Sequence, residues 1–189
     1  MLLATTVSAE KELQQILDLQ QKYLVSNIGK EEMQSQGFLT VQHTPGLLKK
    51  MHSLAPSIII KDGDAVVGYA LVMLRECREL IPELIPMFNT FDNLEYQRVE
   101  QQGKRLIDYS FYVMGQICVA KEYRGQGLFD MLYQKHREVY QPQFHFLVTV
   151  VGTRNSRSMG AHERVGFKTN HTYTDDLDHW AVVLWDWNY

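Results

Sequence analysis

The stretch 117–129 reads ICVAKEYRGQGLF, and its order of residue types predicts a strand, a short turn and the start of a helix. Apolar residues favour a strand over Ser110–Val119, and helical spacing then predicts a helix over Gly127–Tyr140. Gly125 and Gly127 would let an anion approach the backbone of the turn. Because unpaired N–H groups and the positive end of a helix dipole meet at such a turn, the stretch predicts a phosphate or pyrophosphate site.

Two common phosphate-binding motifs are absent from the chain. The pattern G-x-x-x-x-G-K-[ST] does not occur, and Asp130 stands where the dinucleotide fingerprint needs its third glycine. The sequence therefore predicts a phosphate-bearing ligand without the signature of a nucleoside triphosphate or of NAD.

Composition narrows the class of protein further. The chain has 189 residues, 45% of them apolar, and a formal net charge of -3 that is spread without blocks. This size needs no disulfide or metal to hold a core, and the charge argues against nucleic acid or an anionic membrane as partner. No apolar run approaches the roughly 20 residues of a membrane span.

Cysteine and histidine usage gives no sign of a metal site. Cys77 and Cys118 lie far apart without a C-x-x-C motif, and the seven histidines do not cluster at ligand spacing. We therefore expect no metal, reduced thiols and a cytoplasmic location.

The rest of the chain predicts alternating helices and strands around one α/β layer. With no linker and no internal repeat, we treat 1–189 as a single domain. A short helix and irregular chain are expected over 78–108. One face of helix 127–140 is expected to carry Leu128, Met131, Leu132, Lys135 and Val139. The other expected elements are helices over 9–25 (with Ser8 as N-cap), 45–55 and 156–165 and strands over 58–60, 65–74, 144–151, 168–174 and 179–187.

At this point the sequence resembles the GNAT acyltransferase superfamily. In that family a segment of the type V-x-P-x-Y-R-G-x-G-[IL]-[GA] binds the pyrophosphate of acetyl-CoA, and Val119–Phe129 follows it. A second family segment, N-x-x-[AS]-x-x-x-Y-x-x-x-G-F, is matched by Asn155, Ser158 and the pair Gly166-Phe167. The two segments occur in order, separated by a predicted helix and strand.

The resemblance implies a single GNAT-like α/β (α+β) domain. Its central sheet would be mixed and mostly antiparallel, with a splayed parallel strand pair, and helices would flank it. It also implies direct transfer of an acetyl group from acetyl-CoA to an amine, without a covalent enzyme intermediate. The alternative is a non-catalytic CoA-binding or sensing module of the same fold. The acceptor, an acyl chain beyond acetyl, and the choice between monomer and homodimer stay open.

Particular residues receive roles from the same resemblance. The backbone around Cys118, from Ile117 to Val119, would pair with the pantetheine arm like an added strand. Asn155, with Ser158 on the same helix, would contact the pantetheine near the thioester. The residues expected to hold the pyrophosphate are Arg124, Gly125, Gln126, Gly127, Leu128 and Phe129.

Three positions depart from the family pattern. Lys121 replaces a common proline, Phe129 replaces a small residue, and His162 stands where the family has the tyrosine that protonates the leaving CoA thiolate. Transfer from an ordinary imidazolium to a thiolate is downhill by about two pKa units, although only about a quarter of such histidines are protonated at pH 7. His162 is therefore a candidate acid.

A general base is harder to assign. Ser110–Val119 contains no Asp or Glu, so Asp108, Tyr112 or a water relay are the substitutes, and we choose none of them. An acidic group at Asp175, Asp176 and Asp178 either attracts a cationic amine or forms an ordinary solvated turn.

Overall fold

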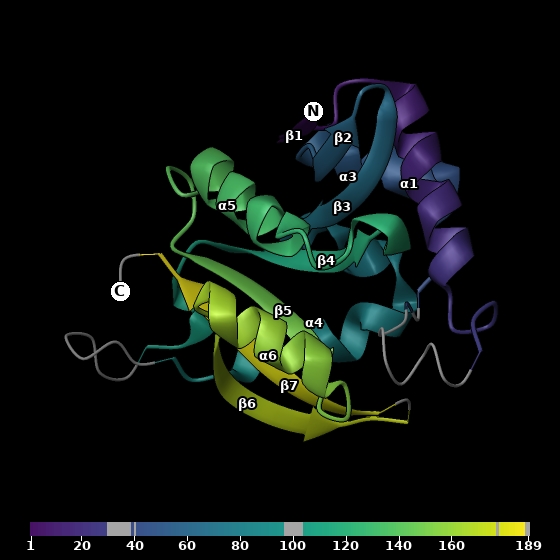
Figure 1. The fold of residues 1–189 in the computed structure, drawn as a ribbon. Coiled ribbons are helices and arrows are strands. Elements are labelled where there is room, and N and C mark those ends of the chain that lie inside the picture. The colour runs from purple at the N-terminus through teal and green to yellow at the C-terminus, as the bar shows by residue number, and fades with distance from the viewer. Residues whose placement is uncertain (30–38, 40, 97–103, 177, 188–189) are drawn as a thin grey trace. The chain divides into compact units, whose positions relative to one another are not determined.

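The computed structural model describes residues 1–29, 39, 41–96, 104–176 and 178–187 (Figure 1). Within these residues the strands form one seven-stranded sheet in the order β1-β2-β3-β4-β5-β7-β6. The strands are β1 (Leu2–Thr6), β2 (Ile58–Asp62), β3 (Ala65–Met73), β4 (Phe111–Val119), β5 (Phe146–Gly152), β6 (Lys168–Thr174) and β7 (His179–Asp186).

Helices separate most of these strands. The α-helices are α1 (Glu10–Tyr23), α3 (Pro45–Leu54), α4 (Ile85–Asn93), α5 (Leu128–Tyr140) and α6 (Ser156–Val165). Short 3-10 helices are η1 (Arg75–Leu80), η2 (Pro82–Leu84), η3 (Leu106–Asp108) and η4 (Lys121–Tyr123). None of the described helices is both long enough and apolar enough to span a membrane.

The sheet confirms the predicted fold class. The pairs β1–β2, β2–β3, β5–β7 and β6–β7 are antiparallel, whereas β4 and β5 are parallel. The parallel register joins Phe111–Val113 to Phe146–Val148, while β4 continues to Val119 and β5 to Gly152. Part of the segment predicted over 78–108 lies outside the described residues, and the described part contains η1, η2, α4 and η3.

Contacts divide the described residues into two compact units. Unit 1 comprises Met1–Met73 and Met114–Val139, and unit 2 comprises Leu74–Val113 and Tyr140–Tyr189. Each unit has its own buried apolar side chains, and each is described here by itself.

Two helices of unit 1 cover opposite faces of β3. Tyr69 lies on the face toward α1, where Gln20 hydrogen-bonds to it. A Cβ placed on Gly68 would lie 3.8 Å from Cδ1 of Leu132 of α5, and the backbone of Ala70 hydrogen-bonds to His136 of α5. Since residues 68 and 70 share one face of a strand and 69 takes the other, α5 and α1 lie on different sides.

The buried face of α5 agrees only in part with the predicted one. Leu128 and Leu132 are buried as predicted, but Met131, Lys135 and Val139 are only half-buried, and Tyr133 and His136 are fully buried. Burial lowers the pKa of His136 to about 3, although the hydrogen bond to Ala70 opposes that shift. His136 is therefore neutral at pH 7 and packs as a core residue, which is why a count of apolar residues alone placed the stripe wrongly.

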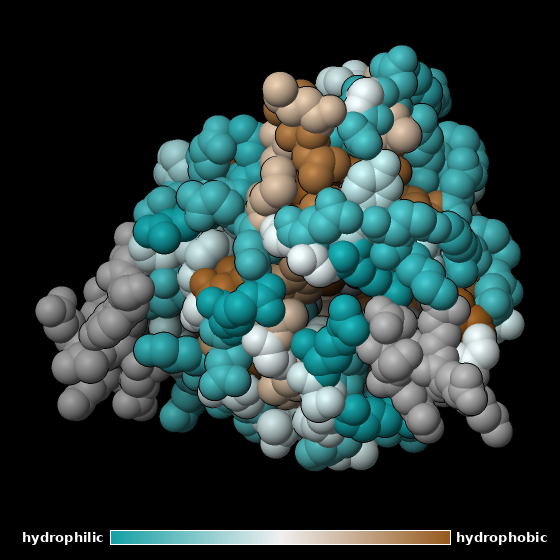
Figure 2. All heavy atoms as spheres, viewed as in Figure 1, coloured by the Kyte–Doolittle hydropathy of each residue, from teal (hydrophilic) through white to brown (hydrophobic). Residues whose placement is uncertain are grey.

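The sequence prediction missed strand β1. Its register pairs Leu2 with Asp62 and Thr6 with Ile58, and it forms one edge of the sheet. Leu3 is 59% exposed on this strand, and Figure 2 shows hydrophobic residues at the surface beside the N-terminus. A five-residue edge strand with one exposed apolar side chain carries too little periodicity to be recognised.

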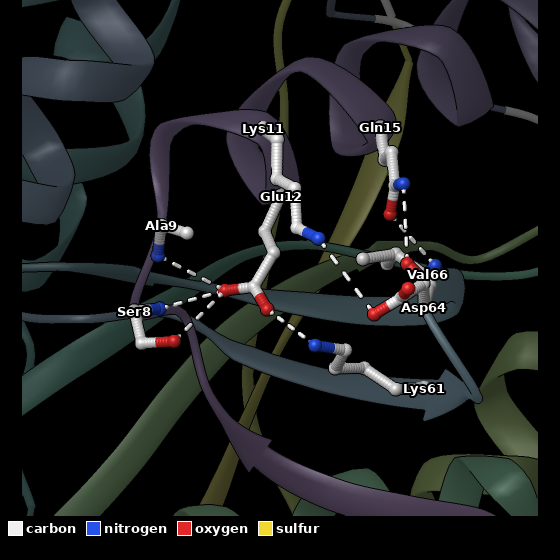
Figure 3. Close-up of polar contacts among 8 residues, drawn as sticks. All are labelled: Ser8, Ala9, Lys11, Glu12, Gln15, Lys61, Asp64 and Val66. Atoms are coloured by element: carbon white, nitrogen blue, oxygen red, sulfur yellow. Dashed lines mark hydrogen bonds and ion pairs between the residues drawn. The ribbon is translucent and has the colours of Figure 1, made fainter.

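A buried carboxylate anchors α1 to the β2–β3 hairpin (Figure 3). Glu12 is 2% exposed; its Oε2 accepts hydrogen bonds from the backbone N–H groups of Ser8 (2.7 Å) and Ala9 (3.1 Å). Its Oε1 lies 2.7 Å from Nζ of Lys61 on β2. The N-cap of α1 is thus Ala9 rather than Ser8, and Glu12 at position N3 reaches back to the N-cap backbone N–H, as the acidic residue of a capping box does.

Unit 2 has aromatic side chains on both faces of its strands. Phe111 of β4 packs edge-on against Phe91 of α4 at 6.1 Å, and the ring of Tyr112 lies 5.0 Å from that of Tyr140. Where α6 ends, Gly166 has φ 120°, and a Cβ there would lie 2.9 Å from Nε1 of Trp185 on β7. Only glycine therefore fits both the backbone and the space at this helix end.

We predict that Glu12→Ala lowers the free energy of unfolding by about 3 kcal/mol, because it leaves the Lys61 ammonium without its buried partner. Glu10→Ala is the matched control on the same helix, since Glu10 pairs with Lys49 with side chains 78% and 67% exposed, and we expect it to change the stability far less because water screens the exposed pair. Urea unfolding of both variants measures the difference. Equal losses would contradict a structural role for the buried pair.

Candidate functional site

The turn between β4 and α5 has the backbone conformation that an anion site needs. Gly125 and Gly127 have φ angles of 77° and 80°, in the left-handed region that favours glycine. A Cβ on either would have no atom within 4 Å, so backbone conformation rather than crowding selects glycine here. Helix α5 begins directly after them, with Met131 N–H donating to the Gly127 carbonyl at 3.0 Å. The turn therefore leads into the N-terminus of a 13-residue helix.

Tyr23, the last residue of α1, supports this turn through its hydroxyl and its ring. Its hydroxyl accepts a hydrogen bond from the backbone N–H of Lys121 at 2.7 Å, and the Arg124 guanidinium lies 4.7 Å from its ring centroid. Arg124 Nε also donates to the Val119 carbonyl at 3.0 Å. Sequence reasoning missed Tyr23, because its helical spacing explains it as one more residue of an apolar stripe.

More exposed contacts hold the same segment. The Tyr123 hydroxyl donates to Asp62 Oδ2 at 3.0 Å, and Lys22 Nζ lies 3.3 Å from the Glu122 carboxylate. Gln126 Nε2 donates back to the Glu122 carbonyl at 3.1 Å. The Gln126 side chain thus closes the turn through the Glu122 carbonyl. This contact does not involve the backbone of Gly125 or Gly127.

Phe129 finds room on its own helix. Its ring packs edge-on against that of Tyr133 at 5.0 Å, and the side chain is half-buried. Leu128 beside it is 1% exposed and anchors the first turn of α5 in the core. A large residue in place of a small one is therefore accommodated by packing along α5.

The side chains at the end of β4 carry no charge. Cys118 is buried, and burial raises the pKa of its thiol to about 12, so no thiolate nucleophile forms there at pH 7. Ile117 and Val119, on the opposite face, are half-buried. The Val119 carbonyl already accepts a hydrogen bond from Arg124. The side chains of Ile117 and Val119 point to the face of the strand opposite Cys118.

Gln116 belongs to a buried polar network that explains why β4 lacks a carboxylate. Its Oε1 accepts from the Tyr69 hydroxyl at 2.6 Å and its Nε2 donates to the Val41 carbonyl at 2.8 Å. Gln20 joins the same network through both the Nδ1 atom and the backbone N–H of His43, each at 3.1 Å. Gln116 must both donate and accept here, which an ionised carboxylate cannot do.

In unit 2, Asn155, Ser158 and His162 lie together on α6. Asn155 is the N-cap, and its Oδ1 accepts from the Ser158 N–H at 3.0 Å. Its Nδ2 has no hydrogen-bond partner among the described residues and remains a donor. The amide oxygen thus starts the helix while the nitrogen can bind a ligand.

His162 is buried rather than on the surface. Its Nδ1 lies 2.8 Å from the Ser158 carbonyl, so Nδ1 carries the proton in the neutral ring, and the ring packs edge-on against Phe167 at 5.1 Å. Burial lowers the pKa of His162 to about 4, although the bond to Ser158 opposes that shift. At pH 7 about one molecule in a thousand carries the imidazolium.

The acidic group near the β6–β7 turn serves the turn itself. Asp175 Oδ1 accepts from the Trp180 indole at 2.9 Å and from the Asp178 N–H at 3.0 Å. Asp178 Oδ2 forms an ion pair with Arg154 at 2.9 Å. Two of the three carboxylates are therefore engaged within the fold, which favours the ordinary-turn interpretation over attraction of a cationic amine.

Asp108, just before β4, and Tyr112, on β4, are the two residues that the sequence suggested as a general base. Neither is placed for proton transfer. Asp108 Oδ2 accepts from the Arg105 N–H at the start of η3, at 2.8 Å. Tyr112 is fully buried among Tyr140, Phe144 and Trp187. Both side chains have a structural explanation.

A sequence profile of the acetyltransferase (GNAT) family matches residues 13–167. This range contains both the glycine turn and the Asn155–Phe167 segment, and the chain therefore belongs to the GNAT acetyltransferase family. A sequence search of curated proteins found no match.

Solved structures share the fold across nearly the whole chain. Ard1 from Thermoplasma volcanium is 14% identical, with a TM-score of 0.64 and coverage of 98% of this chain and 97% of that one. A crystal structure of the NatC complex bound to Gag peptide and CoA gives 12% identity, a TM-score of 0.64 and 98% coverage of both chains. The ribosomal-protein-S18-alanine N-acetyltransferase from Escherichia coli gives 11%, 0.59, and 98% and 94% coverage.

Proposed function

We propose that the chain, over 1–189 as a single domain, is an acetyl-CoA-dependent N-acetyltransferase that acetylates an amine of a small molecule or peptide. The observation that carries the proposal is the turn with positive φ at Gly125 and Gly127 that opens α5 at the end of β4. Family membership supports acetyl transfer as the class of reaction. The CoA bound in the NatC structure supports CoA as the donor's carrier.

We assign binding of the acetyl-CoA pyrophosphate to the turn at Gly125 and Gly127 in unit 1. Backbone N–H groups after Arg124, over 125–129, and the N-terminal end of α5 would receive its negative charge, so a protein of net charge -3 can bind an anionic donor through a local nest. The pantetheine arm is assigned to the backbone at Ile117 and Val119 of β4, in the manner of an added strand. The contact of Arg124 with the Val119 carbonyl leaves the N–H groups and the Ile117 carbonyl for that pairing.

Asn155 supplies the second contact with the donor. Its Nδ2–H would donate to a pantetheine carbonyl while Oδ1 keeps the first turn of α6 in place through Ser158. An amide is suited to this double task, because it offers an acceptor and a donor on one rigid group.

The chemistry would be a direct transfer. The neutral amine nitrogen attacks the thioester carbonyl carbon, a C–N bond forms and the C–S bond breaks, and the CoA thiolate leaves. The new amide nitrogen loses a proton to water, since Gln116 and Cys118 are neutral and offer no base. The thiolate gains a proton, for which His162 is the candidate donor.

Location and assembly follow from weaker observations. Cys77 and Cys118 are buried free thiols, which suits the reducing cytoplasm, and we place the protein there. Both monomer and homodimer are compatible with the proposed reaction.

The test of the function is release of free CoA thiol from acetyl-CoA across a panel of amines. We expect release that an amine stimulates, with the acetylated amine identified by mass spectrometry. The alternative function, a non-catalytic CoA-binding module, is favoured by the neutral His162 and by the absence of a base on β4. Tight CoA binding by calorimetry without turnover of any amine would support that module and contradict the enzyme.

Asn155→Ser separates the two tasks of Asn155. Serine caps a helix about as well as asparagine, so we expect the free energy of unfolding to change by less than about 0.5 kcal/mol. The amide Nδ2 is lost, and the shorter serine hydroxyl, which caps the helix, does not reach its position, so the KM for acetyl-CoA should rise about tenfold, equivalent to about 1.4 kcal/mol. Asn155→Ala should raise KM similarly and also cost about 1 kcal/mol of stability. An unchanged KM in Asn155→Ser would show that Asn155 only caps α6.

His162→Phe tests the proton donor. Because little imidazolium exists at pH 7, we expect a modest loss in kcat of about tenfold at pH 6.5. The donor is needed less as pH rises toward the thiol pKa, about 8.5, so the ratio of parent to variant should approach one by pH 9. His162→Tyr should restore kcat, and His171→Phe, at an exposed position of β6, is the control. A kcat equal to the parent at every pH would rule out the acid role.

A further inference from the structure

We propose that Tyr23 is a positioning residue for the pyrophosphate turn and that it sets the preference for acetyl-CoA over donors without phosphates. The proposal rests on the proposed function, because it takes the turn at 124–129 as the pyrophosphate site. It assigns to α1 a role in donor recognition that neither sequence motif contains.

The first observation is the hydrogen bond to the start of η4. The Tyr23 side chain is 4% exposed, and its hydroxyl accepts the Lys121 N–H at 2.7 Å. The Lys121 carbonyl in turn accepts the Arg124 N–H at 3.3 Å. A fixed Lys121 therefore fixes the peptide that leads into Gly125.

The second observation is the contact of the same ring with the other end of η4. The Arg124 guanidinium lies 4.7 Å from the Tyr23 centroid, a distance at which a cation is attracted to the ring face. Its Nε holds the Val119 carbonyl at 3.0 Å. Arg124 thus bridges Tyr23 to the end of β4, and one buried side chain contacts both the first residue of η4, Lys121, and its C-cap residue, Arg124.

The other supports of the segment are weaker. Lys22 and Glu122 have side chains that are 54% and 62% exposed, so water and salt screen their ion pair. Tyr123 bonds to Asp62, whose side chain is 40% exposed. Tyr23 is the buried support, and its loss should change the turn more than the loss of either exposed contact.

The experiment compares two donors. Acetyl-CoA carries the pyrophosphate, whereas S-acetylpantetheine has the same thioester arm and no phosphate. For each variant we measure kcat/KM with both donors and take their ratio as the joint contribution of the pyrophosphate and the phosphoadenosine that it carries. A substitution that only weakens the fold lowers both values and leaves the ratio unchanged.

Tyr23→Phe keeps the ring and removes the hydroxyl. We expect its acetyl-CoA to acetylpantetheine ratio to fall about tenfold, equivalent to about 1.4 kcal/mol, with acetylpantetheine kinetics unchanged. Arg124→Lys is the second variant, for use if Tyr23→Phe folds poorly. It leaves α1 intact, removes the planar group over the ring, and should lower the same ratio. Tyr96→Phe, which loses a hydroxyl bond to Asp186 in unit 2, is the control that should leave the ratio unchanged.

The outcomes separate the two proposals. If the parent protein turns over acetyl-CoA with none of the amines, whether or not it binds CoA, the proposed function is wrong. If the parent prefers acetyl-CoA and both Tyr23→Phe and Arg124→Lys keep that preference, the positioning role of Tyr23 is wrong while the function stands. Equal losses with both donors would show that Tyr23 only stabilises the fold and would also overturn the inference.

Discussion

The positive φ angles at Gly125 and Gly127 are the constraint on which the candidate donor site depends. An L side chain with such a positive φ angle costs roughly 1–2 kcal/mol per residue. Two such positions, with one residue between them, therefore require glycine for this backbone to be stable. This backbone connects η4, which follows β4, to the first residue of α5. The remaining contacts of the segment, from Tyr23 to Asp62, hold a conformation that the glycines make possible.

Much of the fold could be predicted from sequence because its elements follow simple periodicities. The hairpin around Asp62–Asp64 and the strand–turn–helix at 110–140 agree with the structure within a residue or two. The errors have physical causes. The N-cap of α1 was misassigned since the Glu12 carboxylate acts from inside the helix. His136 was missed as a core residue because its burial requires neutrality, which no sequence pattern states.

The candidate site was predictable only where its residues are adjacent in the chain. Glycine spacing identifies the turn, and the resemblance to the second family segment identifies Asn155. Tyr23 lies 98 residues before Lys121, and its hydroxyl contact exists only in the folded chain. The pairing of Gln116 with Tyr69 and Val41 is similarly distant in sequence. Contacts of this kind need the structure, because each partner taken alone has an ordinary explanation as a core residue.

The titratable groups around β4 and α6 share one property, which is that burial keeps them neutral. Burial raises the pKa of Cys118 to about 12 and lowers that of His43 and His162 to about 4. None of these groups can remove a proton efficiently from an alkylammonium of pKa about 10.4 at pH 7. An amine with a pKa near 8 supplies its own neutral form to a substantial extent, so it needs no base from the protein. In the proposed reaction, the neutral fraction of the acceptor amine would therefore decide how much a general base could contribute.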